Sequence, residues 1–325
     1  MTPLKHLAVK QCHADPKLDW LRALLGAPDK APAVALSADQ LDACIGEGLA
    51  PLLARKLDDG YAIFQHEARQ LAMRELAHEQ ALQRLAAACL QASLDVLVIK
   101  GEALARTLHT QPCTRTRTDI DLWVHRSQLP RLRGILQALG YPTIVAIEQQ
   151  WARFEVVHGQ AHPPSVAFDV HVHPFFRPRM LQQRPFEAVW QDARALPGME
   201  PLRAPAALDA LLIAALHLAK NPHKRWIWLY DIDRLCVLNP QAVTQSCALA
   251  PSWGIASLVT DALCRSVAVF ATQLPCALPQ PLGDESLASM LDAPHKLTAL
   301  RRDIALLPGW RERVGFLREL FFRPR

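Results

Sequence analysis

The feature that most constrains the fold is residues 118–125, TDIDLWVH, in which charged and apolar side chains alternate. Side chains of a β-strand point to opposite faces with a period of two, so Asp119 and Asp121 share one face while Ile120 and Leu122 share the other. Two such carboxylates lie about 6 to 7 Å apart and repel each other. Because the neighbours are apolar, the pattern predicts a buried strand whose aspartates bind a cation.

Mg²⁺ is the expected cation, because it takes hard oxygen ligands, keeps several waters and is commonly completed by substrate phosphates. An Asp-x-Asp pair alone is also common at solvated strand ends and turns. The metal interpretation therefore depends on what the neighbouring segments contribute.

A second alternating strand, residues 166–173, VAFDVHVH, carries Asp169, His171 and His173 on one face. A third carboxylate from a neighbouring strand would complete a two-metal site for in-line phosphoryl transfer. Magnesium sites favour oxygen ligands. The two histidines are therefore expected to donate hydrogen bonds near the metals, to contact the substrate, or to be structural.

A short β-branched run over residues 96–99 predicts a strand that ends at Lys100 and Gly101, ahead of a helix over 102–109. Such a junction places backbone N–H groups where an anion can bind, and Lys100 adds a cation. The alternative is an ordinary helix start with a solvated lysine.

The periodicity divides the chain into three regions and predicts an α+β fold. Residues 1–92 are expected to be helical, with a long helix over 65–91, and residues 181–325 are expected to be helical again. Between them, residues 93–180 are expected to form the catalytic core, a small mixed sheet of β-α-β-α-β-β-β order. Ser127 is expected to cap a helix over 128–139 that ends at Gly140, followed by strands over 141–147, 151–158 and 165–172.

Two helical segments carry further predictions. The stripe expected to pack in the core along the long helix is Leu71, Leu76, Leu82, Leu85 and Ala88. Residues 226–238 repeat Asp-Ile-Asp, but two positions on a helix are turned about 200° apart, which argues against a shared metal. We expect Asp231 and Asp233 to cap that helix or to pair with nearby basic residues. These are Lys224, Arg225 and Arg234.

Composition sets the remaining limits. A net charge of +5 over 325 residues suits a phosphate-bearing ligand, but the chain lacks the concentrated basic stripe of nucleic-acid binders. Eight scattered cysteines without a CxxC pair predict reduced, mostly buried thiols. We expect a cytoplasmic protein with no membrane association, because no signal-peptide pattern and no apolar run of roughly 18 residues is found.

Four motifs of this chain occur in the order in which a known family carries them. They are Ile99-Lys100-Gly101, Arg115 ahead of Asp119-Ile120-Asp121-Leu122, Gly140-Tyr141, and Asp169-Val170-His171. Together they resemble the uncharacterised nucleotidyltransferase family of the DNA polymerase β-like superfamily. The helices that carry His217 and Tyr230-Asp231 resemble the C-terminal helical part of that family, so the resemblance covers most of the chain.

The resemblance implies that Asp119, Asp121 and Asp169 bind two catalytic Mg²⁺ ions. It also implies that Asp169 orients or deprotonates the acceptor hydroxyl, and we expect His171 to lie near the nucleotide.

The resemblance further implies that Gly101 stands at the loop that holds the nucleotide phosphates, with Lys100 and Arg115 near the charge of the transferred group. The superfamily pattern at this loop is Gly-Gly or Gly-Ser, whereas this chain has Lys-Gly-Glu. The change removes a serine hydroxyl, and Glu102 adds a negative charge.

The implied reaction transfers a nucleoside monophosphate from an NTP, with ATP as the expected donor, to a hydroxyl-type acceptor. A small molecule or peptide is expected as acceptor rather than RNA, because a basic stripe interleaved with aromatic residues is missing. Two alternatives stay open. The same metal face could transfer another phosphate-linked group, such as a sugar, or hydrolyse a phosphate ester, and the chain could also be a non-catalytic nucleotide-binding or partner-binding module.

Overall fold

The computed structural model describes residues 12–26, 35–57, 61–148, 154–160, 165–173, 184–221, 223–282, 285, 304, 307 and 309–321. Their fold is α+β, as predicted, with a seven-stranded mixed sheet in the order β3-β4-β5-β2-β1-β7-β6. The strands are β1 Leu97–Ile99, β2 Ile120–Trp123, β3 Thr143–Glu148, β4 Phe154–Gly159, β5 Ala167–His171, β6 Arg194–Ala195 and β7 Arg203–Ala204.

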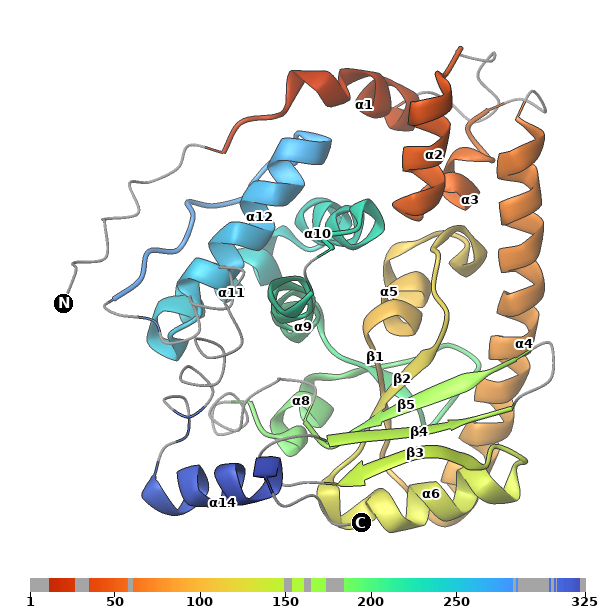
Figure 1. The fold of residues 1–325 in the computed structure, drawn as a ribbon, viewed down its shortest axis with the longest axis vertical. Coiled ribbons are helices and arrows are strands. Elements are labelled where there is room, and N and C mark those ends of the chain that lie inside the picture. Colours follow the sequence, from red (N-terminus) through yellow and green to blue (C-terminus); the bar gives the residue numbers. More distant parts are fainter. Residues whose placement is uncertain are drawn as a thin grey trace.

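Helices precede and follow the sheet in sequence and cover both of its faces (Figure 1). The N-terminal helices are α1 Asp19–Gly26, α2 Ala38–Gly46, α3 Ala50–Leu53 and α4 Ala62–Ala92. Those within the core segment are α5 Lys100–Leu108 and α6 Leu129–Ala138. The later ones are α8 Phe186–Asp192, α9 Ala207–Lys220, α10 Trp226–Leu238, α11 Pro240–Trp253, α12 Ala256–Phe270 and α14 Trp310–Phe321. In the described part of the chain, none of the helices combines the length and apolar character needed to cross a bilayer.

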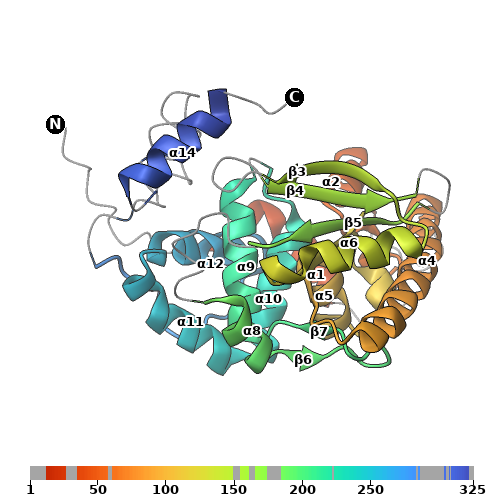
Figure 2. The ribbon, with the colours of Figure 1, turned by 90° about the horizontal axis from the view of Figure 1, so that it is seen from below.

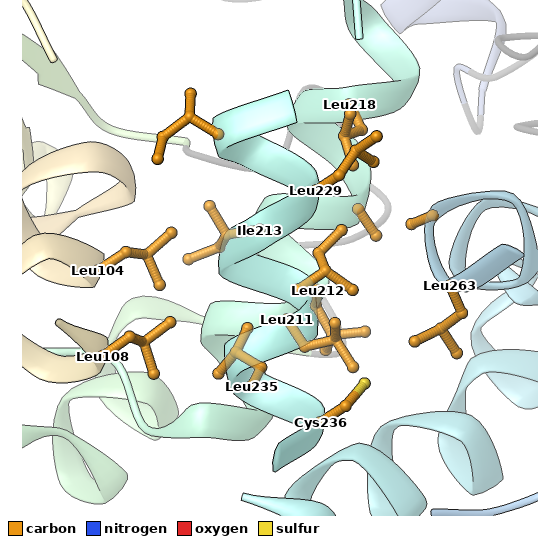
Figure 3. Close-up of a cluster of buried hydrophobic side chains, with 14 of the residues drawn as sticks. Leu104, Leu108, Leu211, Leu212, Ile213, Leu218, Leu229, Leu235, Cys236 and Leu263 are labelled. Atoms are coloured by element: carbon orange, nitrogen blue, oxygen red, sulfur yellow. The ribbon is translucent and has the colours of Figure 1, made fainter. Parts of the chain in front are cut away.

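The central strands are buried on both faces, and alternate residues enter two different cores. Val98, Ile120 and Leu122 pack toward α4 and α6. Leu97, Ile99 and Trp123 pack toward the other face, which α5 and the C-terminal helices α9, α10 and α12 cover. Figure 3 shows part of this second core, where Leu104 of α5 faces Ile213 of α9 and Leu108 faces Leu235 of α10. The charged face of β2 therefore lies toward the C-terminal helices.

Most of the predicted elements are confirmed, including the long helix, the helix that ends at Gly140, and the strands that match β1, β2, β3 and β5. Gly140 adopts φ +89°, the left-handed value that ends a helix readily only at glycine. Residues 151–153, expected to begin the strand now seen as β4, and most of 301–325 outside α14 lie outside the described residues.

Three expectations about local structure were wrong. Ser127 does not cap α6; it lies in a 3-10 turn, where its Oγ pairs with His125 Nδ1 at 2.7 Å. Leu76 is 68% exposed, because it follows Leu71 by five residues and so points about 140° away from it around the helix. The C-terminal region is not entirely helical, since β7 pairs with β1 and β6 pairs with β7.

The cysteines also depart from expectation. Cys12 and Cys264 form a disulfide, with their Cα atoms 5.0 Å apart, so the prediction of reduced thiols was wrong for this pair. They lie 252 residues apart in sequence, which spacing alone does not predict. The other cysteines are free thiols, and most of them are buried.

Candidate active site

Strand register brings the two predicted carboxylate strands together. β2 runs parallel to β5, with Asp121 opposite Asp169, and antiparallel to β1, with Ile99 opposite Asp121. Lys100 directly follows β1, so its side chain reaches the same point. Three adjacent strands thus contribute charged groups to one place on the face that the C-terminal helices cover.

Four side chains meet at this place and are defined here as the Asp121 cluster: Lys100, Asp121, Asp169 and His171. The Nζ of Lys100 donates to Oδ1 of Asp121 at 2.5 Å. His171 Nε2 lies 2.7 Å from the same oxygen and 3.1 Å from Oδ2 of Asp169. Because one imidazole nitrogen contacts both carboxylates, it fixes their relative position.

Asp121, Asp169 and His171 could hold a metal ion. Each offers a ligand atom, and these atoms all lie within 4.8 Å of one another. Among the described residues, every side-chain hydrogen bond to Asp121 reaches Oδ1, which leaves Oδ2 for a metal. The two carboxylates supply the hard oxygens that suit Mg²⁺, whereas imidazole suits it less well. His171 thus fits better as a hydrogen-bond donor to the carboxylates.

Asp119 lies just before β2 and outside the group of three possible ligands. It remains electrostatically linked to the cluster: burial and the like charge of Asp121 raise the pKa of Asp119, while the charge of Lys100 lowers it. The structure therefore brings together two of the three predicted metal carboxylates and leaves the third beside them.

The charges of the cluster stabilise each other. Burial opposes the ionisation of Asp121, yet Lys100 and His171 hold its pKa well below the usual range of a carboxyl. Burial likewise disfavours the ammonium of Lys100, but Asp121 outweighs that effect and raises the pKa of Lys100. At neutral pH, Asp121 is therefore a carboxylate and Lys100 an ammonium.

Lys100 occupies a strained backbone position, with φ +50°. A residue with a Cβ pays roughly 1–2 kcal/mol for this left-handed conformation. The conformation lets α5 begin at once after β1, with the lysine side chain turned toward Asp121. Strain of this kind tends to persist where function requires it.

Gly101 is packed against a buried arginine. A Cβ built on Gly101 would lie 2.7 Å from Nη1 of Arg115. Arg115 is only 4% exposed, and its Nε and Nη2 donate to Asp231 of α10, the shortest contact being 2.6 Å. His109 Nε2 adds a contact to Asp231 at 3.2 Å. The guanidinium of Arg115, whose charge Asp231 neutralises, thus packs against Gly101.

The partners predicted for the second Asp-Ile-Asp were wrong. Asp231 pairs with Arg115 and His109, and Asp233 accepts a hydrogen bond from Thr272 Oγ1 at 2.8 Å. The partners of Asp231 are more than a hundred residues away in the sequence and that of Asp233 is 39 residues away, so tertiary packing and not the neighbouring basic residues determines these contacts.

Glu102 does not add a free charge to the loop. It is fully buried, and its carboxylate accepts hydrogen bonds from Arg117 Nε at 2.5 Å and Arg106 Nε at 2.6 Å, with His78 Nδ1 at 3.0 Å. Burial opposes its ionisation, but His78 and the two arginines hold the pKa of Glu102 well below its usual range. Glu75 of α4 pairs with both arginines. The spacing of Glu102 and Arg106 by four residues on one helix was the only sequence signal of this network.

The C-terminal helices add a histidine that local sequence patterns did not assign to the site. His217 follows Ile213 by four residues, so it lies on the face of α9 that packs against α5 (Figure 3). Its ring meets the Trp228 ring edge-on, with centroids 4.5 Å apart. Burial, assisted by the charge of Lys100, lowers the pKa of His217 to about 4. A neutral imidazole therefore lies near the Asp121 cluster.

A family described as uncharacterised nucleotidyltransferase matches residues 39–267. No curated protein matches the chain. Two solved structures of an antibiotic-resistance factor, ANT(2″)-Ia, are similar to it in part. The solution structure has 15% identity and a TM-score of 0.37, covering 54% of this chain and 92% of that one. The crystal structure in complex with adenylyl-2″-tobramycin has 14% identity and a TM-score of 0.37, covering 56% and 99%.

Proposed function

Because the chain belongs to the uncharacterised nucleotidyltransferase family, we propose that it transfers a nucleoside monophosphate from an NTP, with ATP as the expected donor, to a hydroxyl-type acceptor. The observation that carries this proposal is the meeting of Asp121, Asp169 and Lys100 on adjacent strands. Carboxylates held beside a fixed ammonium suit a reaction in which negatively charged groups are brought together and the charge of the transition state must be stabilised.

Asp119, Asp121 and Asp169 are proposed to hold two Mg²⁺ ions, which when bound would polarise the transferred phosphate and lower the pKa of the acceptor oxygen. Asp169 is 28% exposed at its side chain, so it can also receive and orient an acceptor hydroxyl. Asp121 is more deeply buried and suits the metal-holding role. His171 keeps both carboxylates in position through its Nε2 atom.

The junction of β1 and α5 is proposed to receive the nucleotide phosphates. The backbone N–H groups at the start of α5 are proposed to bind a phosphate, because the helix dipole there favours an anion. The missing side chain of Gly101 leaves room for the guanidinium of Arg115. Lys100 balances the charge of Asp121 and of the transferred phosphate. Arg115, whose charge Asp231 neutralises, packs against Gly101 and holds the junction of β1 and α5 in place.

The acceptor is proposed to be a small molecule or peptide rather than RNA. Arg115 and Arg117 are buried in ion pairs with carboxylates, and the mostly buried Arg106 pairs with Glu102 and Glu75. They cannot present the exposed basic track that a nucleic-acid backbone requires.

Titration calorimetry of each of the four NTPs, with and without Mg²⁺, tests the proposal. We expect magnesium-dependent binding of one NTP to the wild type, and loss of that binding in the double variant Asp121→Asn, Asp169→Asn. Release of pyrophosphate from the bound NTP on addition of candidate acceptors would separate this reaction from sugar transfer or phosphate-ester hydrolysis.

The matched control is Asp233→Asn, which changes the corresponding aspartate of the second Asp-Ile-Asp. That side chain contacts Thr272 and not the Asp121 cluster. Binding should therefore be retained. Absence of NTP binding to the wild type would count against the proposed reaction and favour a non-catalytic role.

A further inference from the structure

Arg225, the residue directly before α10, has an unsatisfied guanidinium. Its side chain is partly buried, and its Nε is buried without a hydrogen-bond partner. Within the described ranges, no carboxylate forms an ion pair with it, whereas Arg106, Arg115 and Arg117 each have one. A guanidinium carries five N–H donors, and leaving one buried without an acceptor is costly.

Packing holds this side chain beside the segment that supports the phosphate loop. A Cβ built on Gly48 would lie 2.7 Å from Nη2 of Arg225, and Gly48 has φ +82°. The carbonyl of Gly48 accepts a hydrogen bond from Thr116 Oγ1 at 2.8 Å. The neighbour of Thr116 is Arg115, whose guanidinium lies against Gly101. A chain of contacts through Arg115, Thr116 and Gly48 thus connects Gly101 with Arg225.

The surrounding charges leave Arg225 ready for an added anion. Burial lowers the pKa of Arg225 and the charge of Arg115 lowers it further, while Glu47 raises it. Among the described residues Glu47 forms no ion pair with Arg225, and its Oε2 accepts the backbone N–H of Trp226 at 2.8 Å. Two arginines therefore lie near each other, and only Arg115 has a carboxylate bound to it.

We infer that Arg225 binds the β- and γ-phosphates of the nucleotide whose α-phosphate reaches the Asp121 cluster. This inference rests on the proposed function. A planar guanidinium can bind two phosphate oxygens at once, and such a ligand would offset the repulsion from Arg115. In this chain of contacts Arg115 and Thr116 stand between Gly101 and Arg225, so Arg225 suits the distal end of a triphosphate. The site thus favours an NTP over a nucleotide sugar, which has no γ-phosphate.

The test compares Arg225→Gln and Arg225→Lys with the wild type. Calorimetry with Mg²⁺ measures the dissociation constants of the bound NTP, of the corresponding NMP and of inorganic tripolyphosphate. We expect Arg225→Gln to weaken NTP and tripolyphosphate binding by about tenfold or more and to leave NMP binding unchanged. The affinity of Arg225→Lys for NTP and tripolyphosphate should lie between those of the wild type and Arg225→Gln, because lysine keeps the charge but not the planar fork.

Arg131→Gln is the matched control, because it removes the same charge from an exposed position on α6. Equal NTP affinity of Arg225→Gln and wild type would overturn the inference and leave the proposed function intact. An equal loss for NMP and NTP would also overturn it, since a general distortion would then be the cause.

Wild-type protein that binds tripolyphosphate through Arg225 but binds no NTP would support the anion site while overturning the proposed function. Wild-type protein that binds neither would overturn both. Circular dichroism of every variant checks that the fold is retained.

Discussion

The same tripeptide, Asp-Ile-Asp, occurs twice in this chain and has two different outcomes. On β2 it places Asp121 beside Asp169, with one oxygen of Asp121 left without a side-chain partner among the described residues. On α10 it places Asp231 among hydrogen-bond donors, and Arg115 and His109 together contact both of its carboxylate oxygens. Both carboxylates are buried beside cations. Only Asp121, however, has acceptor capacity left for a ligand, which distinguishes a candidate metal ligand from a structural ion pair.

The largest effect should come from Asp231→Asn, which leaves the Arg115 guanidinium buried without its counter-ion. Breaking a buried pair in this way costs about 3–5 kcal/mol of unfolding free energy. Urea denaturation measures the loss. A variant as stable as the wild type would show that Asp231 is not the structural member of the comparison.

Asp121→Asn should act mainly on turnover. We expect kcat for nucleotidyl transfer to fall by about 10²–10³, because the site loses a carboxylate that is proposed to hold the Mg²⁺ ions. Pyrophosphate release gives the rate, and the melting temperature should change little compared with Asp231→Asn. The opposite pattern, with a large loss of stability and normal turnover of the folded fraction, would show that Asp121 has a structural role, as Asp231 does.

Gly101→Ala tests how firmly Asp231 fixes the loop. The new methyl would meet Arg115 Nη1 at 2.7 Å, and Arg115 cannot move away while Asp231 holds it. We expect a loss of about 1–3 kcal/mol in stability together with weaker NTP binding. Gly134→Ala is the control: nothing lies within 4 Å of its Cβ, and an alanine in the interior of α6 should be neutral or stabilising. Equal behaviour of the two variants in denaturation and NTP titration would contradict this account.

Asp233→Asn should have the smallest effect. Burial raises the pKa of Asp233, so its charged form is already disfavoured. The amide oxygen of asparagine can still accept the hydrogen bond from Thr272. We expect a change within about 1 kcal/mol in stability and none in turnover. A large loss of activity would mean that the helical motif contributes to the reaction after all.

Local sequence patterns predicted the parts of the molecule that short-range periodicity controls. The alternation in residues 118–125 and 166–173 identified two strands and the face that each presents to the site. Placing His171 in direct contact with Asp121 required the parallel register of β2 and β5, which the alternation leaves open. The position of Asp119 beside the cluster depends on where β2 begins, and a shift of one or two residues at a strand end lies beyond such patterns.

The features of the site that sequence patterns missed depend on contacts between segments that are apart in the sequence. No local pattern indicates that Arg117 is buried, yet it lies against Glu102 and Glu75. Nothing near Asp231 in sequence points to Arg115, because 116 residues separate the two. Buried ion pairs of this kind need both partners to be brought together by the tertiary fold.

The pairing of β7 with β1 has a consequence for whether residues 93–180 can be isolated as a fragment. In the described sheet, β1 lies between β2 and β7, and the hairpin of β6 and β7 forms the end of the sheet opposite β3 (Figure 2). A fragment that stopped at residue 180 would lack this hairpin and leave β1, whose residues are all buried, as an open apolar edge. Open edges of that kind recruit strands from other molecules. The short hairpin thus protects the sheet against aggregation, although it lies outside the segment that carries Asp121 and Asp169.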